Sequence, residues 1–124
     1  MKIIYIAGPY RASTEWAVES NIRAAALTAA TVLMHGAMPF CPHNNLAHMG
    51  GVVPDDQILD GDIEVLKRCD AIFVLPGWKD SEGATRERQV AAENAIPILY
   101  NESQLAAYLT MVEDEDDEAV FPDA

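Results

Sequence analysis

Two acidic residues stand where apolar side chains are expected, and carboxylates placed in this way can perform acid–base or covalent chemistry. The first is Asp62, which falls at helical spacing in the middle of an apolar stripe made of Ile58, Leu59, Val65 and Leu66. A carboxylate removed from water costs several kcal/mol unless it has a partner or a task. The pattern therefore indicates either a catalytic acid or a structural acid that satisfies a buried base or a backbone group.

The second inward acid is Glu87, on the next predicted helix. Its helical face carries Gly83, Ala84, Val90 and Ala91, and these small side chains leave room beside the carboxylate. Glu87 also lies in the first turn of its helix, where the positive end of the helix dipole favours an anion. Two inward acids on neighbouring helices favour a functional site over a structural one, with Glu87 better suited to be a nucleophile than a proton donor.

The elements that must position these acids alternate between strands and helices. Apolar runs predict strands at 2–7, 37–40, 71–75 and 96–100. Helical spacing and capping signals predict helices from Ser13 or Thr14 to Gly36, from Asp55 to about Arg68, from about Ala84 to Asn94, and from Ser103 to Val112. This order predicts a flavodoxin- or Rossmann-like three-layer α/β sandwich with a four- to five-stranded parallel sheet.

Three loops follow the carboxyl ends of the predicted strands, where open parallel sheets bind their ligands. They are Gly8–Ser13, Cys41–Val53 and Pro76–Gly83, and they hold most of the polar and glycine residues outside the helices. Their placement predicts a binding site at this edge of the sheet.

Individual side chains in these loops have two interpretations each. Arg11 could pair with a phosphate, because guanidinium binds anions bidentately, or it could lie free on the surface. Trp78 or Tyr10 could stack on a nucleobase or pack at a loop edge. His43 and Asn44 could hydrogen-bond a base or a ribose.

Composition limits the classes of protein to which the chain can belong. A chain of 124 residues, half of them hydrophobic, predicts one domain at residues 1–112. Residues 113–124 form a predicted acidic tail, expected to be mobile, that begins EDEDDE. The formal net charge is −12, and a surface this acidic excludes the wrapping of nucleic acid, whose phosphates require Lys and Arg.

The remaining sequence features predict a cytoplasmic protein without a metal or cofactor. There is no signal-peptide pattern and no apolar run of about 20 residues that could span a membrane. The two cysteines give no disulfide framework. The set Cys41, His43, His48 and Cys69 matches no strong zinc-ligand spacing.

Ordered motifs over residues 1–100 resemble the nucleoside 2-deoxyribosyltransferase superfamily. Residues 4–9 (IYIAGP) resemble its opening strand and loop, and residues 80–87 (DSEGATRE), followed by Ala91 and the run 96–98 (IPI), resemble its nucleophile segment. Asp62, followed by the strand that begins near Asp70, resembles its catalytic Asp helix and next strand. The chain as a whole is most similar to short members often carried by phages and bacteria.

The resemblance implies a nucleoside N-glycosidase or transferase with a covalent glycosyl-enzyme intermediate. Glu87 would be the nucleophile, Asp62 the general acid or base at the nucleobase, and Tyr5 the residue that hydrogen-bonds Glu87. Ser81 matches a phosphate-binding serine of the branch that hydrolyses nucleoside 5'-monophosphates, which favours hydrolysis over transfer. The chain departs from that branch at Pro9 and in lacking a long C-terminal region.

The resemblance also implies a small-molecule nucleoside or nucleotide as substrate and a homo-oligomer, a dimer or larger, as the assembly. Together with the loop positions, it predicts that the substrate is held by Gly8, Pro9, Arg11, Ser13, His43, Asn44, Gly77, Trp78, Ser81 and Gly83.

Three other functions stay open from the sequence. The chain could be a nucleotide-binding sensor without catalysis, which would use the same loops without requiring both acids to face inward. It could be an NAD-cleaving glycohydrolase on a similar fold. It could also be an interaction protein whose acidic tail mimics nucleic acid, in which case residues 113–124 would carry the function.

Overall fold

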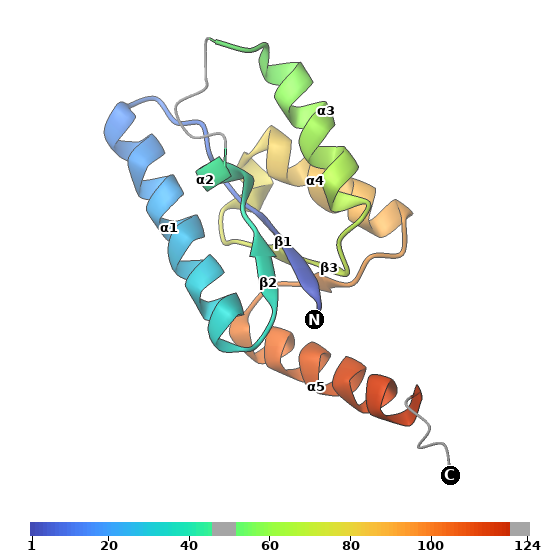
Figure 1. Cartoon of the computed structure of the whole chain (residues 1–124). Coiled ribbons are helices and arrows are strands. Elements are labelled where there is room, and N and C mark those ends of the chain that lie inside the picture. Colours follow the sequence, from blue (N-terminus) through green and yellow to red (C-terminus); the bar gives the residue numbers. More distant parts are fainter. Residues whose placement is uncertain (46–51, 120–124) are drawn as a thin grey trace.

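The molecule is built on a four-stranded parallel sheet with helices on both faces (Figure 1). The structure, a computed structural model, describes the backbone of residues 1–45 and 52–119 and the side chains of 1–43 and 52–113. The strands are β1 (Ile3–Ala7), β2 (Met38–Phe40), β3 (Ala71–Val74) and β4 (Ile98–Leu99), in the order β2-β1-β3-β4. The predicted parallel α/β architecture is confirmed, with four strands in the described residues.

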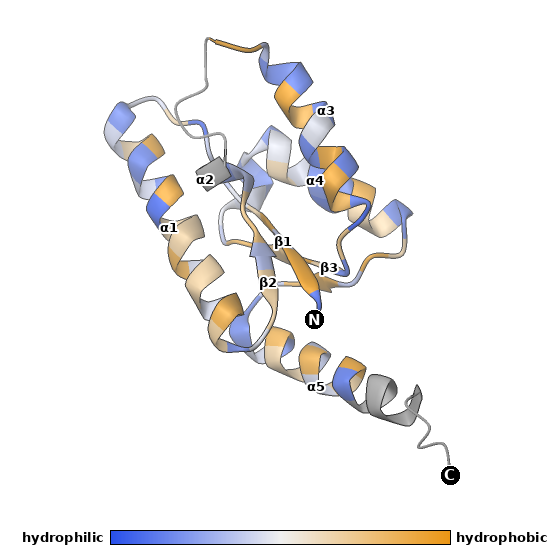
Figure 2. Ribbon diagram, viewed as in Figure 1, coloured by the Kyte–Doolittle hydropathy of each residue, from blue (hydrophilic) through white to orange (hydrophobic). Residues whose placement is uncertain are grey.

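Helices cover the sheet in two layers. They are α1 (Glu15–Met34), α2 (Pro42–Asn45), α3 (Asp55–Leu66), α4 (Glu82–Glu93) and α5 (Glu102–Ala119), with a short 3-10 turn, η1 (Trp78–Asp80), before α4. One apolar cluster joins the sheet to α1 and α5, and a second joins its other face to α3 and α4. In Figure 2, α3 shows apolar and polar residues in alternating patches, as expected of a helix with one face on the sheet.

The alternation of side chains along β1 supplies both layers. Ile4 and Ile6 are fully buried in the cluster under α1 and α5, while Tyr5 and Ala7 are fully buried on the opposite face. Successive side chains of a strand point to opposite faces of the sheet, so one five-residue strand serves two cores.

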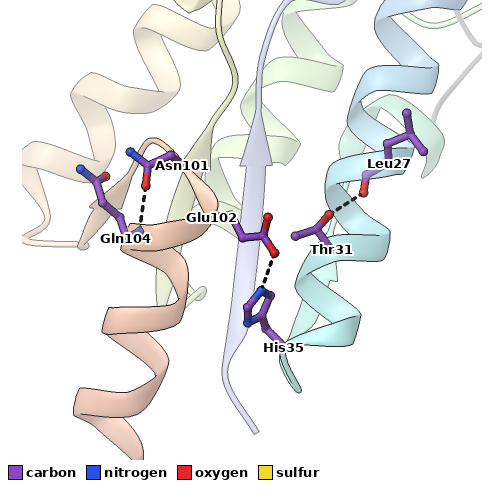
Figure 3. Close-up of polar contacts among 6 residues, drawn as sticks. All are labelled: Leu27, Thr31, His35, Asn101, Glu102 and Gln104. Atoms are coloured by element: carbon purple, nitrogen blue, oxygen red, sulfur yellow. Dashed lines mark hydrogen bonds and ion pairs between the residues drawn. The ribbon is translucent and has the colours of Figure 1, made fainter.

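The helix starts follow the capping signals in the sequence. Thr14 Oγ1 accepts a hydrogen bond from Ala17 N at 3.1 Å at the start of α1. At the other end of this layer, His35 contacts Glu102 at 2.9 Å and so joins the end of α1 to the start of α5 (Figure 3). Asn101 Oδ1 accepts from Gln104 N at 2.8 Å in the same region (Figure 3). The contacts of Thr14 and Asn101 satisfy free backbone N–H groups at helix starts, whereas the contact between His35 and Glu102 joins two side chains.

Three predicted boundaries were wrong. Helix α5 continues to Ala119 rather than ending at Val112, because no Gly or Pro interrupts the stretch and Glu and Ala are good helix formers. The predicted loop after β2 begins with the short helix α2, whose first residue, Pro42, suits a helix start. The last strand shortens to Ile98–Leu99, since only these residues pair with β3.

The division of the chain into a domain at 1–112 and a tail at 113–124 stays a prediction. Within the described residues, no helix has the length and apolar character needed to cross a membrane.

Candidate active site

The site lies beyond the carboxyl ends of β1 and β3. These strands are neighbours, and the chain builds the sheet outward from them in both directions, with β2 on one side and β4 on the other. Ligands of open α/β sheets bind at this kind of switch point. A cavity of about 950 Å³ opens here. It is lined by Gly8, Pro9, Tyr10, Arg11, Pro42, His43, Asp55, Asp56, Ile58, Leu59, Asp62, Gly77, Asp80, Ser81, Glu82, Gly83, Ala84 and Glu87.

Glu87 is the most deeply placed carboxylate of this cavity. Helix α4 turns it inward together with Ala84 and Ala91, and only 6% of its surface is exposed. Burial raises the pKa of Glu87 to about 8, with the charge of Asp62 adding to the rise and a hydrogen bond from Tyr5 opposing it. The inward face predicted from the sequence is confirmed by the burial of these three residues. The predicted position in the first turn was wrong, because α4 begins at Glu82 and Glu87 lies in its second turn.

Tyr5 reaches Glu87 from the middle of β1. Its hydroxyl donates a hydrogen bond to Glu87 Oε2. Burial, and then the charges of Glu87 and Asp62, raise the pKa of Tyr5, so the phenol keeps its proton and acts as a donor. A donor aimed at a carboxylate favours the ionised form of that carboxylate.

Asp62 faces the same cavity from α3. It is half-buried, and within the described residues its carboxylate has no hydrogen-bond or ion-pair partner. Burial raises its pKa to about 6. A carboxylate that is unpaired, lines a cavity and titrates near neutrality can exchange a proton with a bound ligand.

The two carboxylates titrate as a pair. With pKa values of about 6 and about 8, the pair holds one proton between these pH values. Because the pKa of Glu87 is the higher of the two, this proton lies mainly on Glu87, and the hydrogen bond from Tyr5 raises the population of the state in which Glu87 is ionised and Asp62 is protonated. That state contains one anionic nucleophile and one acid.

Most loop residues predicted from the sequence line the cavity. Gly8, Pro9, Arg11, His43, Gly77, Ser81 and Gly83 all contribute to its wall. Two of them have additional roles: Arg11 forms an ion pair with Asp55, and Ser81 Oγ accepts from Ala84 N at 3.1 Å as the cap of α4. Gly83 has open space where a Cβ would be, so the cavity is not filled at that point.

Two predicted residues, Trp78 and Ser13, do not line the cavity. Trp78 packs against Arg88, whose guanidinium carbon lies 4.6 Å from its ring centroid, and against the core beneath α4. Ser13 is exposed in the loop before α1 and does not line the cavity. The side chain of Asn44 lies outside the described residues, as does all of His48.

The structure adds residues that the sequence did not single out as ligand contacts. Asp55, Asp56, Ile58 and Leu59 line the cavity from the first turns of α3. The signal was present, because they share the helix that carries Asp62 and precede it by one or two turns. Within the described residues, no group of three metal-ligating side chains gathers in a way that could hold a metal ion.

Comparisons with known proteins agree with this architecture. A family model described as a domain of unknown function (DUF4406) matches residues 2–100. No curated protein matches the chain. A 2-deoxyribosyltransferase from Bacillus psychrosaccharolyticus is similar in structure, with a TM-score of 0.59 and 17% sequence identity over 77% of this chain and 69% of that one.

Two further solved structures are similar to the chain. A 2-deoxyribosyltransferase from Leishmania mexicana has a TM-score of 0.58 and 23% identity, over 80% of this chain and 63% of that one. A conserved protein from Enterococcus faecalis has a TM-score of 0.63 and 22% identity, over 79% of this chain and 61% of that one. Since the family model spans most of the sequence, the chain belongs to the DUF4406 family and has the fold of the nucleoside 2-deoxyribosyltransferase superfamily.

Proposed function

We propose that this protein breaks the N-glycosidic bond of a nucleoside or nucleoside 5'-monophosphate through a covalent glycosyl intermediate on Glu87. One observation carries the proposal: a buried glutamate that accepts a hydrogen bond from Tyr5 shares a cavity with the unpartnered, half-buried Asp62. The fold shared with two 2-deoxyribosyltransferases supports the same class of reaction.

The first chemical step follows from the charges of the two acids. As the bond between C1' and the base nitrogen breaks, positive charge develops on the sugar as an oxocarbenium-like transition state. The Glu87 carboxylate stabilises this charge and forms the new bond to C1'. Asp62 donates its proton to the departing nitrogen, and the base leaves neutral. The enzyme then holds a glycosyl ester on Glu87 and an ionised Asp62.

The second step returns both acids to their starting states. Asp62, now a carboxylate, accepts a proton from an incoming water or nucleobase as that group attacks C1'. The ester bond to Glu87 breaks, and Glu87 leaves as the carboxylate. Water gives hydrolysis and a second base gives transfer. We favour hydrolysis because Ser81 lines the cavity and matches the hydrolytic branch.

The test is a search for free nucleobase by mass spectrometry. The protein is incubated with nucleosides, nucleoside monophosphates, their deoxy forms and NAD, with and without a second base as acceptor. We expect base release by the wild type, none by Glu87→Gln, and unchanged release by Glu93→Gln, which removes an exposed charge on the same helix. Trapping of a glycosyl adduct on the peptide that contains Glu87 would identify the nucleophile.

Each other outcome points to a different function. Cleavage of NAD alone would favour the glycohydrolase alternative. No release from any substrate by the folded protein, with saturable nucleotide binding, would overturn the proposal in favour of a sensor.

We also expect a homo-oligomer in the cytoplasm, and light scattering measures its molar mass.

A further inference from the structure

The loop at residues 8–11 forms one wall of the cavity, and hydrogen bonds from other elements to its backbone carbonyl groups hold it in place. His43 Nε2 lies 2.8 Å from the carbonyl oxygen of Pro9, which is 34 residues away in the sequence. Only 6% of His43 is exposed, although the residue lines the cavity. One ring nitrogen of this candidate ligand contact, Nε2, is therefore already paired with the protein itself.

The chemistry of this contact determines where the ring proton is. A carbonyl oxygen only accepts hydrogen bonds, so Nε2 must carry the hydrogen and donate it. Burial lowers the pKa of His43, with the carbonyls of Pro9 and Gly8 opposing part of that change. The ring is therefore neutral near pH 7, with its hydrogen on Nε2.

The neighbouring peptide groups of the loop are also tied to other elements. Asn21 Nδ2, from α1, donates to the carbonyl oxygen of Tyr10 at 3.1 Å. The Tyr10 ring meets the His43 ring edge-on, with 5.4 Å between centroids and an interplanar angle of 89°. At the base of the loop, a Cβ added to Gly8 would lie 2.6 Å from Leu75 Cδ1, so the backbone lies directly against the end of β3.

We propose that His43 is a positioning residue, whose Nε2–H donation to Pro9 holds the loop at residues 8–11 so that Tyr10 and Arg11 form the cavity wall. The ring contact with Tyr10 and the hydrogen bond to Pro9 act on adjacent residues, so one buried side chain orients both the backbone and the aromatic ring. Glu87 and Asp62 stand on α4 and α3, outside this loop, and Asp62 lies about two turns beyond the ion pair that joins Arg11 of the loop to Asp55 of α3. Loss of the bond therefore acts on ligand binding more than on the chemical step.

The primary test compares two substitutions at the same site. His43→Phe keeps a flat ring of similar size but removes the donor. His43→Gln restores an N–H donor near the position of Nε2. By hydrogen exchange followed by mass spectrometry, we expect the amide of Leu75, which donates to the carbonyl oxygen of Ala7 at the base of this loop, to exchange about tenfold faster in His43→Phe and near the wild-type rate in His43→Gln. His35→Phe, at the far end of α1 and outside the cavity lining, serves as the matched control and leaves the exchange of this amide unchanged.

A measurement on the wild-type protein guards against a variant that does not fold. The ring ¹⁵N chemical shifts of His43 report which nitrogen carries the hydrogen, and we expect the neutral Nε2–H form at pH 7. The Nδ1–H form or a charged ring would overturn the proposal. Wild-type exchange in a folded His43→Phe, or a folded His43→Gln that exchanges as fast as His43→Phe, would overturn it as well.

The expected effect of His43→Phe on catalysis rests on the proposed function and is measured in a separate experiment. Once a substrate that the wild type cleaves is identified, we expect His43→Phe to raise KM about tenfold and to change kcat less than twofold. We expect KM to return to near the wild-type value in His43→Gln. A fall in kcat at unchanged KM would overturn the positioning role. If the wild type cleaves no nucleoside, the proposed function fails while hydrogen exchange and the ring shifts still decide the role of His43.

Discussion

The two faces of the sheet differ in what they bury, although the same strand supplies both. Under α1 and α5 the buried side chains are almost all apolar, with Ile4 and Ile6 at the centre. The polar contacts of that layer join side chains at helix ends, such as His35 and Glu102 (Figure 3), or satisfy backbone carbonyls, as the Tyr108 hydroxyl does at Asp70. Under α3 and α4 the same strand buries Tyr5, which is hydrogen-bonded to a glutamate inside the layer.

The difference indicates that one face contributes mainly stability and that the other provides the ionisable groups of the site. Apolar burial contributes stability roughly in proportion to area, and the α1–α5 face is built for it. The α3–α4 face buries the ionisable side chain of Glu87, which costs free energy of folding. Such a cost is typical of sites that use a carboxylate in binding or catalysis. Substitutions on one face should therefore affect mainly stability, and those on the other mainly activity.

The largest expected effect is on turnover, from Glu87→Gln. The amide keeps the size of the side chain and an acceptor for Tyr5, but it cannot form the glycosyl ester. We expect base release to fall by at least about 10³-fold while the circular dichroism spectrum is unchanged. A folded variant that keeps a tenth of the wild-type rate would refute the role of Glu87 as nucleophile.

The same substitution should remove much of the pH dependence of stability. Glu87 has a folded pKa of about 8, above the ordinary value of 4.5, so the folded state binds its proton more tightly than the unfolded chain does. This contribution is complete below about pH 4.5 and is lost as pH rises through about 8. Between pH 5 and 9, the free energy of unfolding of the wild type, measured with denaturant, should fall by about 3–5 kcal/mol relative to that of Glu87→Gln. Parallel curves for the two proteins would contradict the buried environment of Glu87.

On the opposite face, Ile6→Ala should lower stability without lowering intrinsic activity. Ile6 is fully buried in the cluster under α1 and α5, and truncation of such a side chain leaves a cavity. We expect a loss of about 2–5 kcal/mol in the free energy of unfolding. The rate per folded molecule should stay within about twofold of wild type; a tenfold loss would show that the two faces are not independent.

The neighbouring substitution Tyr5→Phe should have a smaller effect, mainly on activity. It removes the hydroxyl that lowers the pKa of Glu87, so the carboxylate ionises at higher pH. Hydrogen bonds to charged groups contribute about 1.5–3 kcal/mol, which predicts a fall in kcat/KM of roughly 10–100-fold at pH 7. The pH profile of the wild type should show limbs near 6 and 8, and the limb near 8 should move upward. If the limb near 8 does not move in Tyr5→Phe, the hydroxyl of Tyr5 does not influence the ionisation of Glu87.

The smallest expected effect is that of Glu102→Gln on the α1–α5 face. Two-thirds of the Glu102 side chain is exposed, and its partner His35 lies at the end of α1. Exposed ion pairs contribute less than about 1 kcal/mol, so the melting temperature should fall only slightly. Base release should equal that of wild type, and a clear loss would place this contact in the catalytic machinery.

The helices that carry the two inward acids, α3 and α4, were predictable because their patterns of apolar and polar residues are clear. In α4, small residues surround Glu87 on one face and charged residues occupy the other, so helical spacing alone indicates that Glu87 points inward. The same reasoning applies to Asp62 in α3, whose carboxylate lines the cavity. A buried carboxylate on an apolar face is a local signal.

Helix α1 shows where that signal fails. Its residues are apolar or small on nearly every side, so the spacing of Ile22, Ala26, Ala29 and Leu33 correctly predicts a helix but does not mark its buried face. The structure buries Ala25 and Val32 and leaves Leu27 71% and Leu33 55% exposed. Trp78 was similarly ambiguous, because the sequence did not show that Arg88 and Tyr100 would stack beside it.

By itself, the sequence determined the alternating elements, the three loops at one edge of the sheet and the two acids that face inward. These follow from periodicity and turn chemistry within about 20 residues. Only the tertiary structure decided that the hydroxyl of Tyr5 meets Glu87, 82 residues later, and that His43 Nε2 meets the carbonyl oxygen of Pro9. The physical reason is that the order of the strands places β1 between β2 and β3, and no local pattern encodes which distant residues then come into contact.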